Sequence, residues 1–264
     1  MISTIVATAF YTTAWASLLT TIRRKTTPSP LLTALLIAGI AVHAFSVYES
    51  VFSPHSIHLG FFQVASVLFL MMNIIVTIST QRLPLHNVFL LLLPLSVAAL
   101  FCALLTGAPS GLSSNLTLPL VTHILLSIIA YSLLMIATLQ ALLLAYQNSR
   151  LKSHHVKSLM GVFPPLQTME RLLFDFVWAG FILLTLSIGT GIIFIENMLA
   201  QQLSHKLVFS LASWMIYAVL LGGRHAIGWR GNAAIRWVLA GFLMLMIAYF
   251  GSKFVLEFLL TTTT

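Results

Sequence analysis

Eight long apolar stretches, separated by short polar or charged segments, dominate this chain of 264 residues. Each is close to the roughly 20 residues that a helix needs to cross a bilayer core about 30 Å thick. With 59% hydrophobic and 7% charged residues, the chain cannot surround one apolar core with a polar surface in water. We therefore predict eight membrane crossings, at residues 2–22, 31–52, 60–79, 87–106, 119–146, 174–196, 206–222 and 233–259.

The crossings are expected to be helices, because the alternating apolar and polar pattern of a membrane barrel does not recur along the chain. The predicted fold class is thus an all-α integral membrane protein, with residues 1–264 forming a single polytopic domain. The longest polar stretch, residues 147–173, is predicted to be a cytoplasmic interfacial loop with a short surface helix. Pro164 and Pro165 should end any helix that arrives from the N-terminal side.

Lysine and arginine residues fall almost entirely on one side of the predicted crossings. The loops of the other side hold only Lys206 and Lys253. Short cytoplasmic loops retain positive charge, so the basic side is predicted to be cytoplasmic and both termini are predicted to lie outside. The basic loops hold Arg23, Arg24, Lys25, Arg82, Arg150, Lys152, Lys157, Arg171, Arg224, Arg230 and Arg236.

Composition argues against several classes of function. The net charge of +8 is spread over several membrane-facing loops, so contact with anionic lipid explains it better than nucleic acid does. The single cysteine, Cys102, excludes an intramolecular disulfide, a four-cysteine zinc site and a covalent c-type heme attachment motif. With five carboxylates and no phosphate loop or nucleophile elbow, the chain is not expected to be an enzyme.

Histidines within or beside the crossings are the candidate functional groups, because an ionisable side chain in the membrane is costly to keep there. His43 falls near the middle of the second crossing, and His123 falls about one turn inside the outer start of the fifth. His205 opens the seventh crossing, while His55 and His58 follow the second. Heme ligation, a transition metal site and proton relay each suit such groups, as does a structural hydrogen bond to a neighbouring helix.

The second half of the chain resembles a known family. The carrying segments are TMERLLFDFVWAGFILLTLSIGTGIIF and the stretch from SHKLVFSLASWMIYAVLLGG to the final crossing. The most specific pieces are Trp214, Tyr217 and Ala218, then Gly228–Gly231 and the Tyr249–Gly251 step. These residues are similar to the core of the cytochrome c assembly membrane proteins of the CcsA and HemX type, most of all to their short inner-membrane subgroup.

The resemblance implies a heme-handling protein of the bacterial inner membrane. Members of the family bind heme within or at the outer face of the membrane and pass it to apocytochrome c. In the segment THILLSIIAY, His123 matches an outer-face histidine that the family would use as an axial ligand of heme iron. His43 matches a recurrent histidine of the second helix, so heme is the expected cofactor of both.

The chain also departs from the family pattern. The tryptophan-rich outer loop that cradles heme is replaced by IENMLAQQLSHK, in which Ser204-His205-Lys206 stands where the family has Asp-Pro-Lys. A histidine of the seventh helix aligns with Gly222, and a second outer histidine after the last helix has no counterpart. His205 is a candidate substitute ligand, since it should lie close in depth to His123.

Because these family residues are missing, a second class of function remains open. The fold could serve as a structural or regulatory partner of another membrane protein, such as a transporter, without handling heme. The segments Phe163–Glu170 and Gly228–Gly231 would then be contact surfaces. Anchoring of Trp229 and Arg230 at lipid headgroups is the simpler interpretation of the second segment. A role as a small-molecule transporter has less support, because only His43 approaches the midplane.

Overall fold

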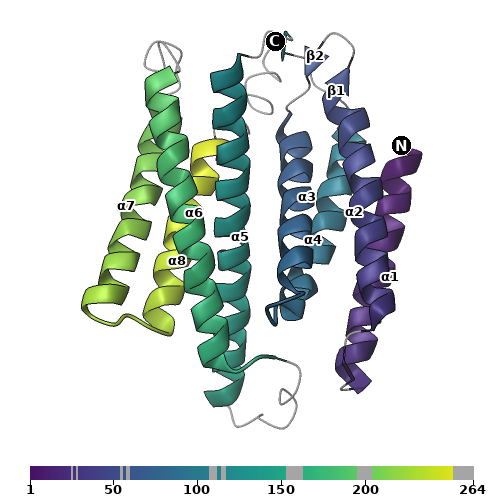
Figure 1. The fold of residues 1–264 in the computed structure, drawn as a ribbon, viewed down its shortest axis with the longest axis horizontal. Coiled ribbons are helices and arrows are strands. Elements are labelled where there is room, and N and C mark those ends of the chain that lie inside the picture. Colours follow the sequence, from purple (N-terminus) through teal and green to yellow (C-terminus); the bar gives the residue numbers. More distant parts are fainter. Residues whose placement is uncertain are drawn as a thin grey trace. The chain divides into compact units, whose positions relative to one another are not determined.

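The computed structural model describes residues 1–24, 26–27, 29–53, 56–57, 60–106, 112–113, 117–152, 163–194 and 204–251. Across these ranges, eight helices are long and apolar enough to cross a membrane, which confirms the predicted all-α membrane fold. The helices are α1 Ile2–Arg24, α2 Pro30–Val51, α3 Phe61–Ser79, α4 Phe89–Thr106, α5 Leu118–Lys152, α6 Leu166–Phe194, α7 Ser204–Ala226 and α8 Asn232–Met246 (Figure 1).

Short elements accompany the helices. A 3-10 turn at His86–Val88 precedes α4, and a π-helical turn at Ile247–Gly251 continues α8. Three strands of two residues each form a small antiparallel sheet: β1 Phe52–Ser53, β2 Ser56–Ile57 and β3 Leu112–Ser113. No sequence period marks strands this short, so hydropathy alone does not predict them.

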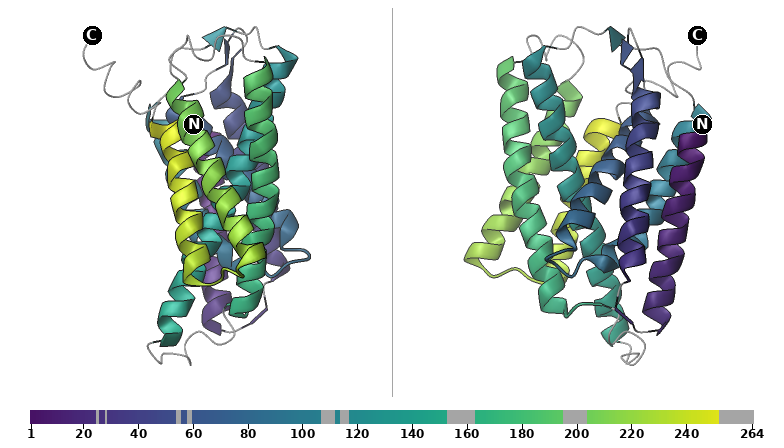
Figure 2. Two further views of the ribbon diagram at one scale, coloured as in Figure 1. Left: turned by 90° about the vertical axis from the view of Figure 1, so that its left-hand side faces the viewer. Right: turned by 45° about the vertical axis from the view of Figure 1, so that its right-hand side comes forward.

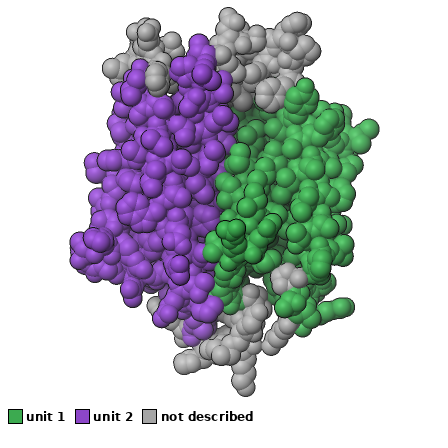
Figure 3. All heavy atoms as spheres, viewed as in Figure 1, with its two compact units in different colours: residues 1–115, 155–164 green, residues 116–154, 165–264 purple. Residues whose placement is uncertain are grey.

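The chain divides into two compact units (Figure 3). Unit 1 comprises residues 1–115 and 155–164, and its described part holds α1 to α4 with the small sheet. Unit 2 comprises residues 116–154 and 165–264 and holds α5 to α8. Inside each unit, successive helices run antiparallel (Figures 1 and 2).

The antiparallel order gathers positive charge at one end of each unit. In unit 1, Arg23 and Arg24 end α1, and Arg82 lies in the turn after α3. In unit 2, Arg224 ends α7 and Arg236 lies in the first turns of α8. This arrangement is the one on which the predicted orientation depends. Which end faces the cytoplasm stays a prediction.

Helices cover most of the described part of residues 147–173, the predicted interfacial loop with its short surface helix. Residues 147–152 continue α5, and residues 166–173 form the first turns of α6. Hydropathy fails there because a membrane helix can extend into its polar flank without a change of backbone structure. Pro165 directly precedes α6, and its carbonyl oxygen accepts a hydrogen bond from the Met169 N–H at 3.1 Å. Residues 153–162 lie outside the described ranges.

Candidate functional site around His123

His123 lies in the second turn of α5 and is half-buried against α6. Its Nδ1 atom is 2.9 Å from the carbonyl oxygen of Ser187 and 3.3 Å from the Thr190 hydroxyl. A carbonyl oxygen only accepts hydrogen bonds, so Nδ1 carries the proton and donates it. The neutral ring therefore keeps the lone pair on Nε2, the atom that is available to bind a metal.

Serine side chains hold the two helices together beside this histidine. The Ser127 hydroxyl donates to the carbonyl oxygen of His123 at 2.7 Å, one turn away on the same helix. Because that contact uses the only proton of Ser127, the Ser187 hydroxyl donates to Ser127 Oγ across the interface, also at 2.7 Å. Ser187 thus fixes α5 through its side chain and orients the His123 ring through its carbonyl group.

A close helix approach lies further along the same interface. A Cβ atom built on Gly180 of α6 would lie 2.7 Å from the Leu134 side chain of α5, so any larger residue would force Leu134 or the helices to shift. Small residues at an interface let two membrane helices pack closely. This contact and the serine bridge fix α6 against α5, and thereby fix the Ser187 carbonyl at the histidine ring.

Ser127, Ser187 and Thr190 were not predicted as site residues from the sequence. Ser187 and Thr190 both fall inside the segment TMERLLFDFVWAGFILLTLSIGTGIIF that carries the resemblance. One signal was present in the pattern, since Ser127 follows His123 by four residues and therefore lies on the same face of α5. The partner on α6 has no such signal, because it depends on how both helices are rotated.

His43 has a different environment in unit 1. It is fully buried, its Nδ1 lies 3.0 Å from the Tyr11 hydroxyl, and its Nε2 lies 3.0 Å from the Ser66 hydroxyl. These contacts join α2 to α1 and α3. Gly39, one turn before His43, leaves room for the Tyr11 ring, which a Cβ atom there would approach to 2.8 Å. To bind iron, either nitrogen of His43 would have to release a partner.

Of the other predicted histidines, the structure describes only the backbone of His205. His205 lies in the first turn of α7, but its side chain, like His55 and His58, lies outside the described part of the structure. Within the described ranges, no group of three or more His, Cys, Asp or Glu side chains is placed to hold a metal ion.

The aromatic residues that carry the family resemblance pack the helices of unit 2 together. Tyr217 is fully buried, and a Cβ atom on Gly241 of α8 would lie 2.9 Å from its ring. Trp214 stacks on Phe181 of α6 with ring centroids 5.5 Å apart. Tyr249, in the π-helical turn, lies edge-on to Tyr131 of α5 at 6.2 Å. These contacts join all four helices of unit 2.

Trp229, predicted as a lipid or partner surface, also packs inward. Its ring stacks on Trp237 at 5.3 Å, and it covers Gly223 so closely that a Cβ atom there would lie 2.4 Å away. Arg230 beside it is exposed. A role for either residue at lipid headgroups stays a prediction, and Trp229 presents only part of its surface for it.

The turn that carries Trp229 is held by an ion pair. Glu170 of α6 accepts a hydrogen bond from Arg224 Nη1 at 2.8 Å and a second from the Gly231 N–H at 3.3 Å. Arg224 also donates to the Trp229 carbonyl oxygen at 3.1 Å and lies over the Phe174 ring. Glycine is required in this turn, because Gly228 and Gly231 have φ angles of +74° and +54°. The cluster fixes α6 to the α7–α8 connection.

Comparison with known proteins finds several relatives that are similar over half of the chain or more. The chain is 35% identical over 202 residues to the inner membrane protein YpjD of Escherichia coli, covering 75% of both chains. It is 34% identical to an uncharacterized 28.8 kDa protein of Azospirillum brasilense, over 52% of both chains. It is 25% identical to the cytochrome c biogenesis protein CcsA of Prochlorococcus marinus, over 54% of both chains. No solved structure gives a significant match.

The family comparison covers most of the chain, including both membrane histidines. The model of the cytochrome c assembly protein family matches residues 37–260, from α2 through the last described helix. This range contains His43, His123 and His205, and it extends the resemblance well beyond the second half. The chain belongs to the cytochrome c assembly protein family.

Proposed function

We propose that this protein handles heme in the bacterial inner membrane, and that His123 is an axial ligand of the heme iron. The observation that carries the proposal is the hydrogen bond from His123 Nδ1 to the Ser187 carbonyl oxygen. Histidines that bind metals commonly donate their other ring N–H to a carbonyl or carboxylate group, which fixes the tautomer and makes the ligand more basic. Family membership and the CcsA relatives support heme as the ligand.

The described residues fit such a group. His123 is half-buried rather than sealed, and its Nε2 has no hydrogen-bond partner among the described residues. Bound heme would supply an iron centre that can coordinate an imidazole nitrogen, and a planar apolar ring system. The chain itself would hold the ring of His123 in one orientation and one tautomer through Ser187. His205, in the first turn of α7 in the same unit, remains our candidate for a second ligand.

The role of His43 in this proposal is structural rather than ligating. Both of its ring nitrogens are engaged, whereas one nitrogen of His123 is not. Delivery of heme to an apocytochrome is the activity that the family suggests, and it requires no bond-making chemistry by this chain. We accordingly propose a carrier or assembly factor and not an enzyme.

A spectrum of the purified protein tests the proposal. Wild-type protein should retain heme with a Soret band, and His123→Ala should retain less than about a tenth of it. His225→Ala is the matched control, since His225 is an exposed histidine in the last turn of α7. It should retain the wild-type amount of heme. Equal heme in both variants would contradict the assignment of His123.

The same preparation separates the alternative role. If the chain is a structural or regulatory partner of another membrane protein, wild-type protein should carry no heme and should co-purify with that partner in a fixed ratio. Two observations support this alternative. Both ring nitrogens of His43 are hydrogen-bonded, and Gly222 occupies a position where the family has a histidine. Pigment that persists through purification favours the first proposal.

A further inference from the structure

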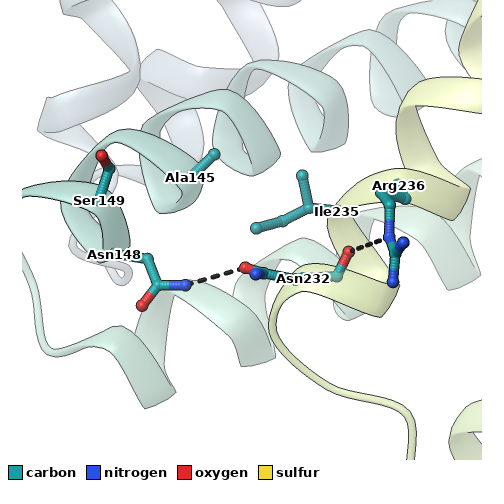
Figure 4. A pocket seen from close by; sticks show the side chains of 6 residues that line it. All are labelled: Ala145, Asn148, Ser149, Asn232, Ile235 and Arg236. Carbon is teal, nitrogen blue, oxygen red and sulfur yellow. Dashed lines mark hydrogen bonds between the residues drawn. The ribbon is translucent and has the colours of Figure 1, made fainter. Parts of the chain in front are cut away.

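A polar cavity of about 450 Å3 lies at the basic end of unit 2 (Figure 4). It is formed between the C-terminal turns of α5 and the first turns of α8. Its volume is many times the roughly 30 Å3 that one water molecule occupies, so it can hold a group of many atoms. The lining residues are Ala145, Asn148, Ser149, Asn232, Ile235 and Arg236.

Hydrogen-bond donors are concentrated in this cavity. Asn148 Nδ2 donates to Asn232 Oδ1 at 2.9 Å, which joins α5 to α8 and fixes the Asn232 amide. With its oxygen so engaged, Asn232 keeps its NH2 group as a donor. Arg236 Nε donates to the Asn232 carbonyl oxygen at 3.4 Å, and this contact uses one of the five guanidinium N–H groups. Figure 4 shows these side chains on facing helices.

The charge of Arg236 is not neutralised by any described carboxylate of unit 2. Glu170 is bonded to Arg224 and Gly231, and Asp175 lies beside Arg171. The first turn of α8 also contains no acidic residue. A guanidinium group with free N–H donors beside a polar cavity is suited to a phosphate group, which it can bind through two parallel hydrogen bonds.

The position of the cavity favours a lipid as the source of that phosphate. The cavity lies at the end of the unit where Arg224, Arg230 and Arg236 gather, on helices that are long enough to cross a membrane. Basic pockets between membrane helices on the cytoplasmic side are typical binding sites for anionic phospholipid headgroups. Ala145 and Ile235 give the cavity an apolar wall, against which the first methylene groups of a lipid acyl chain can pack.

We propose that this cavity binds the phosphate of an anionic phospholipid, with Arg236 as the main ligand and Asn148 and Asn232 as its support. The site is distinct from His123 and does not depend on whether the protein handles heme. A lipid bound there would contact both α5 and α8 from one leaflet of the membrane.

Binding of phosphatidylglycerol to the purified full chain tests the site. The probe is phosphatidylglycerol titrated into detergent-solubilised protein, with retained lipid counted by native mass spectrometry and phosphatidylcholine as the neutral comparison. Arg236→Gln should weaken binding about tenfold or more, as expected for the loss of charge-assisted hydrogen bonds. Arg171→Gln removes an exposed arginine of the same unit that lies outside the cavity, and it should change binding by less than about fivefold.

A variant that keeps every charge separates a built site from general surface attraction. Asn148→Leu should also weaken phosphatidylglycerol binding, because it removes the contact that fixes Asn232. If Arg236→Gln and Arg171→Gln weaken binding equally while Asn148→Leu leaves it unchanged, the proposal is wrong. Inorganic phosphate is the second probe. Displacement of bound lipid by millimolar phosphate, with no preference for phosphatidylglycerol, would assign the cavity to a soluble phosphate compound and overturn the lipid assignment.

Discussion

His123 Nδ1 donates a hydrogen bond to the carbonyl oxygen of Ser187 at 2.9 Å, and this contact sets the tautomer of the histidine. The acceptor is a backbone group, so the side chain at residue 187 does not itself make this contact. The contact depends on the position of α6 against α5, which the Ser127–Ser187 hydroxyl bridge and the Gly180 contact fix. The chemistry of the site therefore rests on the packing of these two helices.

His43→Ala should destabilise the protein without removing heme from the molecules that fold. The substitution leaves the Tyr11 and Ser66 hydroxyls without this buried partner, and each such loss costs about 1–3 kcal/mol. Thermal unfolding in detergent should show a lower midpoint, and heme per folded protein should match wild type. Tyr11→Phe removes one of the two contacts and should lower the midpoint less. Loss of heme at unchanged stability would instead make His43 a ligand.

Adjacent glycines of α7 should respond in opposite directions to the same substitution. Gly223→Ala places a Cβ atom 2.4 Å from the Trp229 ring and should cost about 1–3 kcal/mol, since overpacking forces a shift of the ring or the backbone. Gly222→Ala meets no atom within 4 Å and should stabilise the helix by about 0.5–1 kcal/mol. Thermal unfolding of the two variants measures the difference. Equal midpoints would contradict the packing of Trp229 on Gly223.

Glu170→Ala should destabilise unit 2 by about 2 kcal/mol, because it leaves Arg224 partly buried without its counter-charge and removes the acceptor for the Gly231 N–H. Asp175→Asn is the matched control. It alters an exposed ion pair with Arg171, and such pairs contribute about 0–1 kcal/mol. Thermal unfolding should separate the two variants clearly. A similar loss in both would mean that the Glu170 cluster does not hold the α7–α8 connection.

Labelling with a membrane-impermeant thiol reagent tests the predicted orientation. In a Cys102→Ser background, Thr117→Cys, directly before α5, should be labelled from outside intact cells. Arg82→Cys, in the turn after α3, should be labelled only after the membrane is opened. Both expectations follow from the concentration of arginine on one side of the crossings. The reverse pattern would place the basic loops outside.

The sequence predicted the spans well because hydropathy directly reflects burial in lipid. It placed His123 near the start of α5, and the structure has it in the second turn of that helix. It did not predict the contact with Ser187, since the two residues are 64 positions apart and meet only through the rotation of α5 and α6. The ion pair of Glu170 with Arg224 spans 54 positions and escapes detection for the same reason.

The predicted and observed ends of α5 and α6 differ for another reason. Hydropathy locates the part of a helix that lies in hydrocarbon, but backbone hydrogen bonding continues past it. Hydropathy therefore predicts a loop for the polar residues 147–152, which are helical in the structure. The inward packing of Trp229 likewise depends on Gly223 and Trp237, which the local sequence around the turn does not reveal.

The most direct test of the account is ligand rescue of His123→Gly in purified protein. If His123 holds the heme iron, the glycine variant should lose most of its heme absorbance, and added imidazole should restore heme content and the wild-type visible spectrum. The substitution leaves a space that imidazole can enter, and Ser187 remains to orient it. Wild-type heme content and an unchanged Soret band in His123→Gly without imidazole would contradict the account.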